Sequence, residues 1–225
     1  MTERVLQGMA VKIGLKYIEI WKDSLEDAVV NYEKESCPKG EIVFYGPSNF
    51  TRWSTKWGMK PLRECLLGAS GAACAVNRGF GSSCAEHQLY YYDRMVRALE
   101  PKVLVYSSYG NGSSFGYSDE ETWELAQRVI AWAKTDFPDI RIYLVGAHPS
   151  RDDDTFKTAR KKRYNHIVKS FAETVPDCFF LDLYDHPEFF RKDIYVEDGV
   201  HFNQEGYTLY ASFYREGLKE ELAKY

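Results

Sequence analysis

This 225-residue sequence contains no run of roughly 18 apolar residues, so we expect no membrane-spanning helix. Basic residues are not in excess: the sequence has 29 Lys and Arg and 33 Asp and Glu, which gives a net charge of −4. We therefore expect no nucleic-acid partner. Cysteine is scarce, and its five copies have no zinc-knuckle spacing, which predicts reduced thiols and no metal site. The first residues, MTERVLQGMAVKIG, begin polar and contain no signal-peptide hydrophobic segment, so we expect a cytoplasmic location.

Hydrophobic residues make up 44% of the sequence, which is enough to bury a sizeable core in one large domain. Short apolar runs bounded by Gly, Pro, Ser or Asp alternate with stretches in which apolar residues recur at helical spacing. The runs predict strands and the stretches predict helices. The predicted strands are 41–45, 73–77, 102–107, 141–146 and 178–182, and the predicted helices are 21–35, 61–67, 83–99, 118–135, 155–174 and 204–222.

This alternation of strand and helix is typical of a parallel sheet that helices cover on both faces. We therefore predict a three-layer α/β/α sandwich with a flavodoxin-like five-stranded parallel sheet of order 2-1-3-4-5. Residues 41–225 are expected to form this domain, with residues 1–40 as a helical lead-in packed on it. Ser83 and Ser118, each with a Glu three residues further on, are predicted to cap two of the helices.

The loops that follow the first three strands carry the polar residues of greatest interest. Gly46-Pro47-Ser48 places a hydroxyl on a tight turn at the end of a buried strand, a good position for a nucleophile. Gly81-Ser82 follows the second strand and Gly110-Asn111 the third. In the predicted strand order all three loops lie over one edge of the sheet, so they can converge on one ligand.

A base for such a nucleophile is found just before the last helix, in the run Glu197 to Asn203. Asp198 and His201 are three residues apart, close enough to share a turn. The carboxylate can accept a hydrogen bond from one imidazole nitrogen while the other faces a hydroxyl, the arrangement that activates a serine. Each residue alone is more often an ordinary turn or helix-boundary residue, so the hypothesis depends on their combination.

From residue 41 to the last helix the sequence resembles the SGNH hydrolases, also called the GDSL esterase/lipase family, and within it the small platelet-activating-factor acetylhydrolase-like branch. The resemblance implies that Ser48 is the nucleophile and that Asp198 and His201, in the run DGVHFNQEGY, complete its triad. It also implies an oxyanion hole formed by the backbone amide of Ser82, with Gly81 beside it, and by the side chain of Asn111.

The sequence departs from the family pattern at three positions. Pro47 replaces the aspartate that precedes the nucleophile, and it has no amide hydrogen and a fixed φ. Ser82 stands where the family has glycine. Gly112 replaces the aspartate after Asn111, and an alternative register would place Gly110 at the Asn position and remove that donor.

The resemblance implies a carboxylic ester hydrolase of the EC 3.1.1 type that acts on a small-molecule ester and needs no cofactor. The sequence contains no large insertion that could serve as a lipase lid, which favours short acyl groups such as acetyl. We expect Asn49, Trp53, Tyr109 and His148 to line the substrate site. Two other functions remain open: a catalytically impaired binding protein on the same fold, and a nucleotide- or phosphate-binding module that uses the glycine loop before a helix. The sequence also leaves the oligomeric state open, a homo-oligomer included.

Overall fold

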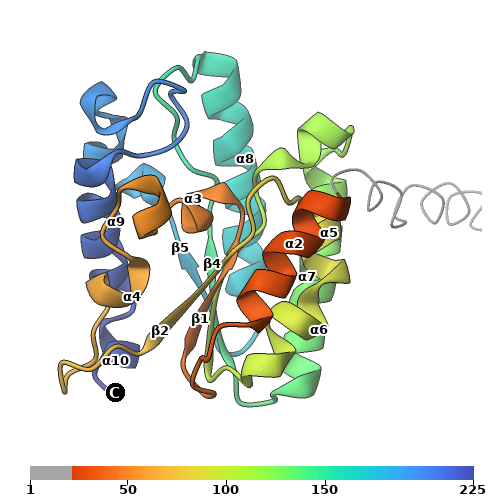
Figure 1. Ribbon diagram of the computed structural model, residues 1–225. Helices are drawn as coiled ribbons and strands as arrows, with labels where there is room; N and C mark the ends of the chain where they lie inside the picture. Colours follow the sequence, from red (N-terminus) through yellow and green to blue (C-terminus); the bar gives the residue numbers. More distant parts are fainter. Residues whose placement is uncertain (1–21) are drawn as a thin grey trace, which may run out of the picture.

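The structure is a computed structural model that describes residues 22–225, so most of the predicted lead-in, residues 1–21, lies outside the described residues. Its five strands form one sheet of order β2-β1-β3-β4-β5, and every neighbouring pair is parallel. The predicted topology is therefore confirmed (Figure 1). The strands are β1 (Ile42–Gly46), β2 (Ala75–Gly79), β3 (Val103–Ser107), β4 (Arg141–Val145) and β5 (Cys178–Leu181).

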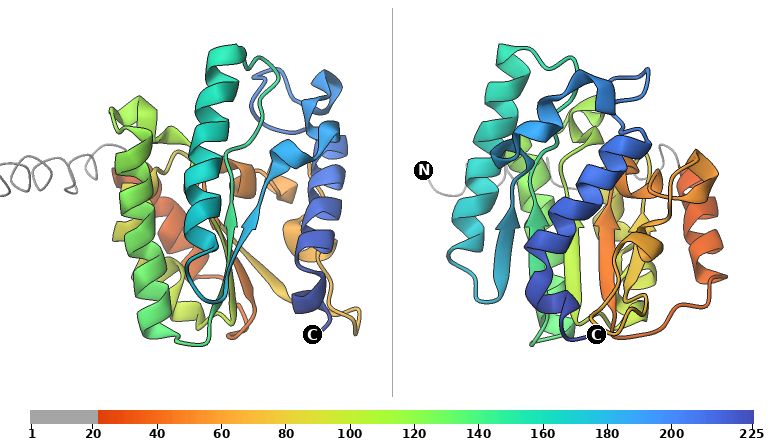
Figure 2. Two further views of the ribbon diagram at one scale, coloured as in Figure 1. Left: turned by 180° about the vertical axis from the view of Figure 1, so that it is seen from behind. Right: turned by 90° about the vertical axis from the view of Figure 1, so that its left-hand side faces the viewer.

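Helices cover both faces of this sheet and complete the three layers (Figures 1 and 2). One face is covered by α2 (Lys22–Glu33), α5 (Ala85–Tyr90), α6 (Tyr92–Met95), α7 (Asp119–Asp136) and α8 (Thr155–Ala172). The other face is covered by α3 (Ser48–Thr51), α4 (Leu62–Cys65), α9 (Gln204–Gly217) and α10 (Lys219–Leu222). Short 3₁₀ turns lie between them: η1 (Thr55–Trp57), η2 (Arg97–Leu99), η3 (Asn111–Phe115), η4 (Leu183–Asp185), η5 (Pro187–Phe190) and η6 (Lys192–Ile194).

The first four residues of β1, Ile42 to Tyr45, are buried on both faces of the sheet. Val43 and Tyr45 belong to the core under α2, α5 and α7, whereas Ile42 and Phe44 belong to the core under α9. Successive side chains of a strand point to opposite faces, and both faces of this sheet are covered by helices. A continuous apolar run is therefore needed to fill both cores, and all four side chains are fully buried.

The helix predicted at 83–99 is wrong in two respects. It is broken into α5, α6 and η2, and its N-cap is Cys84 rather than Ser83. Cys84 forms the capping box with His87, whose Nδ1 lies 3.2 Å from both the Cys84 amide nitrogen and Sγ. Glu86 cannot complete the predicted box because it is buried and accepts a hydrogen bond from Tyr117. The second predicted box, opened by Ser118, is confirmed.

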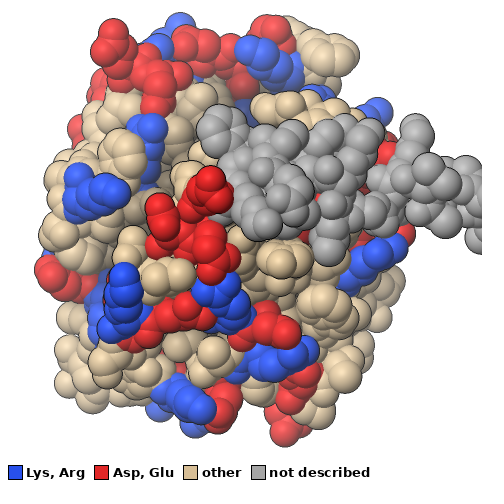
Figure 3. Space-filling model, turned by 45° about the vertical axis from the view of Figure 1, so that its right-hand side comes forward, with Lys and Arg blue, Asp and Glu red and all other residues tan. Residues whose placement is uncertain are grey.

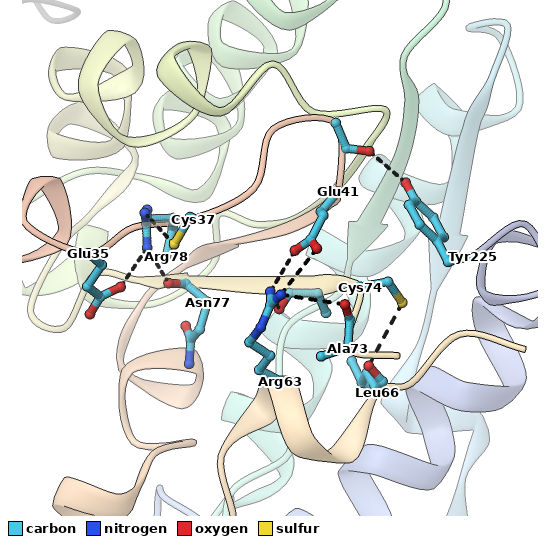
Figure 4. Close-up of polar contacts among 12 residues, drawn as sticks. Glu35, Cys37, Glu41, Arg63, Leu66, Ala73, Cys74, Asn77, Arg78 and Tyr225 are labelled. Atoms are coloured by element: carbon cyan, nitrogen blue, oxygen red, sulfur yellow. Dashed lines mark hydrogen bonds and ion pairs between the residues drawn. The ribbon is translucent and has the colours of Figure 1, made fainter. Parts of the chain in front are cut away.

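The outer edge of β2 is covered by side chains instead of another strand (Figure 4). Arg63 donates to the carbonyls of Ala73 and Ala75, and a two-pronged ion pair with Glu41 holds it in place. The next two outward carbonyls accept hydrogen bonds from Arg78 and Tyr32; these carbonyls belong to Asn77 and Gly79. The backbone acceptors along this edge are therefore already satisfied within the chain.

On the face shown in Figure 3, acidic and basic side chains are mixed over the helices rather than gathered by sign. The absence of a nucleic-acid partner stays a prediction. Within residues 22–225, no helix combines the length and the apolar character needed to cross a bilayer.

Candidate active site

Ser48 is the first residue of α3, directly after β1 and Pro47. Only glycine fits at the end of β1, because a Cβ on Gly46 would lie 2.9 Å from the backbone oxygen of Ser107 on β3. Pro47 occupies the N-cap with extended backbone (φ −75°, ψ −156°), a conformation that proline adopts without strain. Proline in place of an acid therefore leaves Ser48 at the carboxyl end of β1.

A second close approach fixes α3 itself. A Cβ on Gly79, the last residue of β2, would lie 2.1 Å from the Thr51 amide nitrogen, so only glycine lets α3 pack on this strand. Phe50 of α3 packs on the sheet: its ring lies edge-to-face against the ring of Phe44 in β1, with the centroids 5.4 Å apart. The serine is thus carried by a short helix that the sheet supports from two strands.

The predicted partners of Ser48 lie in hydrogen-bonding contact with it. His201 Nε2 is 2.7 Å from Ser48 Oγ, and His201 Nδ1 is 2.8 Å from Asp198 Oδ2. The other carboxylate oxygen, Oδ1, accepts from the backbone amides of Val200 and His201 at 2.9 and 3.0 Å. The Asp-x-x-His turn therefore fixes both the carboxylate and the imidazole that it orients.

The charges around this chain of contacts suit a neutral imidazole beside an ionised carboxylate. Burial lowers the pKa of His201 and Arg52 lowers it further, while Asp198 raises it. Burial tends to raise the pKa of Asp198, but the amides of His201 and Val200 and the imidazole together hold that pKa well below its usual value. Near neutral pH the ring is unprotonated and able to accept the hydroxyl proton.

Arg52 is a member of this cluster that the sequence did not reveal. Its Nη1 lies 3.0 Å from Asp198 Oδ2, the same oxygen that meets the imidazole, and its guanidinium stacks 4.4 Å above the Trp57 ring. Arg52 lies four residues after Ser48, about one helical turn. This spacing is the only feature of the sequence that places the arginine near the nucleophile.

The third loop brings both Gly110 and Asn111 to the cavity that contains Ser48, so the register that uses Asn111 stays a prediction. Asn111 and Ser48 line the same cavity, and Asn111 Nδ2 donates to the Ser83 carbonyl at 2.9 Å. The amide carries two hydrogens, so one remains for a ligand. A Cβ at Gly112 would lie 2.6 Å from Thr122 Oγ1 on α7, so any larger residue there would require the Thr122 side chain to move.

The second loop bears the other predicted oxyanion donor, Ser82. Its φ of +63° is a left-handed conformation that glycine adopts most easily, so the serine retains a backbone suited to glycine. Among residues 22–225, the lining of the cavity that contains Ser48 includes neither Ser82 nor Gly81. Their contribution to an oxyanion hole stays a prediction.

Comparisons with known proteins agree with this geometry. The model of the GDSL-like lipase/acylhydrolase family matches residues 45–209, most of the chain and all of the loops described above. The chain belongs to this family. The predicted family is thereby confirmed, and membership supports ester hydrolysis as the general function. A search of curated proteins found no match to the sequence.

Several solved structures share the fold at low sequence identity. A Streptococcus pneumonia protein provisionally named a platelet activating factor superposes with a TM-score of 0.69 at 19% identity, over 96% of this chain and 99% of that chain. A GDSL-like lipase from Bacteroides thetaiotaomicron gives 0.64 at 16% identity, over 90% and 98%. The acetyl xylan esterase AlAXEase gives 0.64 at 18% identity, over 79% and 98%.

Two adjoining cavities open at the edge of the sheet where this GDSL-like site lies. The smaller, of about 180 Å³, contains Ser48 and Asn111, and three of the residues predicted to line the substrate site also line it: Asn49, Tyr109 and His148. The larger, of about 360 Å³, contains Asp198 and Gly199 and the charged side chains at the start of α8. Tyr109, Gly110, Ser150, Lys161 and Val200 line both cavities.

Trp53 was expected at the substrate site, and this expectation is wrong. The side chain is fully buried in the core under α9, packed against Phe44, Tyr207, Tyr210 and Tyr214. It follows the nucleophile helix by two residues, but the turn after α3 directs it away from the cavity and into the core.

Proposed function

We propose that this protein is a serine esterase that cleaves short-acyl esters by a Ser48–His201–Asp198 triad. The observation that carries the proposal is the unbroken series of short contacts from Ser48 Oγ through both imidazole nitrogens to Asp198 Oδ2. This arrangement gives the hydroxyl a base and gives the base a fixed orientation. Confirmed family membership and the esterase among the structural neighbours support it.

In the proposed reaction His201 Nε2 accepts the Ser48 proton as Oγ attacks the ester carbonyl. The developing oxyanion receives hydrogen bonds from backbone amides and from the free hydrogen of the Asn111 amide. His201 then returns the proton to the leaving alcohol, and a water molecule activated by the same ring releases the acid. Asp198, ionised throughout, stabilises the imidazolium that forms in each half-reaction.

The two cavities suggest where each part of the ester lies. The leaving alcohol must lie on the imidazole side, because His201 protonates it, and the larger cavity contains Asp198 and Gly199 from the same loop. The acyl group then occupies the smaller cavity on the Asn111 side. A volume of about 180 Å³ is below the range of typical drug-sized sites, which favours short acyl groups.

Hydrolysis of p-nitrophenyl acetate and labelling by a fluorophosphonate test the proposal, with Ser48→Ala and His201→Ala as loss-of-function variants. Both variants are expected to lose at least about 10³-fold in kcat, and Ser48→Ala to lose all labelling. Ser170→Ala and His186→Ala, which change the same residue types away from the triad, serve as matched controls. Labelling at another serine would refute the assignment, and a folded wild type that neither labels nor turns over any ester would favour a binding protein.

A further inference from the structure

The turn that carries Asp198 is held from outside by Arg151, a residue of the loop between β4 and α8. The Arg151 amide donates to the Gly199 carbonyl at 2.8 Å. The Arg151 guanidinium donates to two further carbonyls of the turn, from Nη1 to Val196 at 3.2 Å and from Nη2 to Glu197 at 2.9 Å. One arginine therefore binds the backbone of the turn on both sides of Asp198.

An ion pair fixes the orientation of this guanidinium. Arg151 Nε and Nη2 lie 3.1 and 3.0 Å from Asp152 Oδ2. The pair lies directly against Gly199, where a Cβ would be 2.6 Å from Asp152 Oδ2 and 3.0 Å from Arg151 Nη2. Gly199 also has a φ of +71°, in the left-handed region that glycine adopts most easily. Glycine at this position thus lets the arginine and its partner pack against the turn.

Arg151 provides the hydrogen bonds that tie the backbone of this turn to another segment of the chain. The turn, residues 196–201, lies outside the helices and strands, and its other backbone hydrogen bonds are made within the turn itself. Within residues 22–225, no other residue outside the turn hydrogen-bonds to its backbone; Arg52 contacts only the Asp198 carboxylate. The position of that carboxylate, 2.8 Å from His201 Nδ1, therefore depends on a turn that Arg151 holds.

We propose that Arg151 is a positioning residue of the esterase reaction: it holds the turn so that Asp198 keeps the imidazole of His201 directed at Ser48. This inference rests on the proposed triad and adds a residue that does not contact the reacting atoms. Within residues 22–225, the linings of the two cavities do not include Arg151, so its loss removes no contact with a substrate bound in them. Its effect should therefore fall on kcat rather than KM, and should depend on the presence of Asp198.

The kinetics of p-nitrophenyl acetate hydrolysis test the proposal on three variants. Arg151→Met is expected to lower kcat by about tenfold or more and to leave KM within about threefold of wild type, because a shift of about 1 Å in a catalytic group can cost ~10²-fold. Arg151→Lys should give an intermediate kcat, since an ammonium lacks the planar fork that binds two carbonyls. Arg191→Met is the matched control: Arg191 pairs with the carboxylates of Asp193 and Glu205, and its loss should leave kcat unchanged.

A double-mutant cycle separates positioning of the triad from a general loss of structure. Asp198→Ala removes the carboxylate through which Arg151 acts, and the remaining reactivity of Ser48 is followed as the rate of fluorophosphonate labelling over long incubation. In this background Arg151→Met is expected to change the labelling rate by less than about twofold, whereas in the wild-type background it slows labelling by about tenfold or more. Equal factors in the two backgrounds would overturn the proposal, because they show that Arg151 does not act through Asp198.

A folded Arg151→Met protein with the kcat and labelling rate of wild type also overturns the proposal, while leaving the esterase function intact. A folded wild type that neither labels nor hydrolyses the ester overturns both. If Arg151→Met does not fold, Arg151→Lys decides: an unchanged kcat contradicts the positioning role, and a fall of about threefold or more at wild-type KM supports it.

Discussion

Replacing Arg52 by methionine is expected to move the acidic limb of the pH–rate profile toward higher pH. Arg52 Nη1 and His201 Nδ1 contact the same oxygen of Asp198, at 3.0 and 2.8 Å, so the two nitrogens are at most about 6 Å apart. A unit charge at that distance acts on the ring with about 0.7 kcal/mol in a water-like dielectric, equal to ~0.5 pH unit. The water-like value is appropriate because Arg52 is 25% exposed and Asp198 38% exposed.

The sign follows from the role of the base. His201 accepts a proton only when neutral, and Arg52 lowers the pKa of the ring. Without the arginine that pKa rises, so a larger fraction of the ring is protonated at a given pH. The acidic limb of kcat/KM is therefore expected to shift upward by about 0.5–1 pH unit. The plateau at higher pH should fall by no more than about fivefold, because a partly exposed ion pair contributes about 1 kcal/mol or less.

The assay is kcat/KM for p-nitrophenyl acetate between pH 5 and 9, with background hydrolysis subtracted. Arg52→Lys is the matched control: it retains the charge and loses the planar fork, so its acidic limb should stay close to that of wild type. An Arg52→Met limb that does not move, or that moves to lower pH, would refute the electrostatic reasoning.

Four further substitutions test the loops around the nucleophile and the end of β2. Asn111→Ala is expected to lower kcat by about 10²-fold or more through loss of an oxyanion donor, with an unfolding midpoint near that of wild type as evidence of folding. Ser82→Gly should raise the free energy of unfolding in urea by about 0.5–1 kcal/mol, because relief of the left-handed strain exceeds the entropy cost of glycine; a decrease would contradict this. Gly79→Ala should destabilise the protein by about 1–3 kcal/mol and reduce esterase activity, because the new Cβ would collide with the Thr51 amide nitrogen. Gly81→Ala is the control: its Cβ would contact only the Thr51 side chain, at 3.3 Å, so a smaller loss of stability is expected.

The sequence predicted the features that depend on local pattern. Apolar runs between chain-breaking residues located all five strands, and the alternation with helices determined their order. That order brings the loop of Ser48 to the loop of Asn111. The three-residue spacing of Asp198 and His201 predicted their contact, because a single turn can hold both side chains.

Features that depend on packing between distant segments could not be predicted from pattern. Trp53 is buried because α9 supplies a cluster of aromatic rings, one of which, Tyr207, lies 5.7 Å away and 154 positions further along the chain. Glu86 does not cap α5 as predicted, and its carboxylate instead accepts a hydrogen bond from Tyr117, which lies 31 residues later. Asn49 and His148 likewise line the smaller cavity together only because the folded sheet brings their loops to one edge.

The covered edge of β2 has a consequence for assembly. An incoming strand would need the outward carbonyls that Arg63, Arg78 and Tyr32 already occupy, and it would have to displace the ion pair between Arg63 and Glu41 first. Sheet extension at this side is thus blocked by charge and by occupied acceptors. A homo-oligomer, if the chain forms one, is therefore not expected to form by strand addition at this edge, and the same contacts of the folded chain oppose the strand-to-strand pairing that begins aggregation.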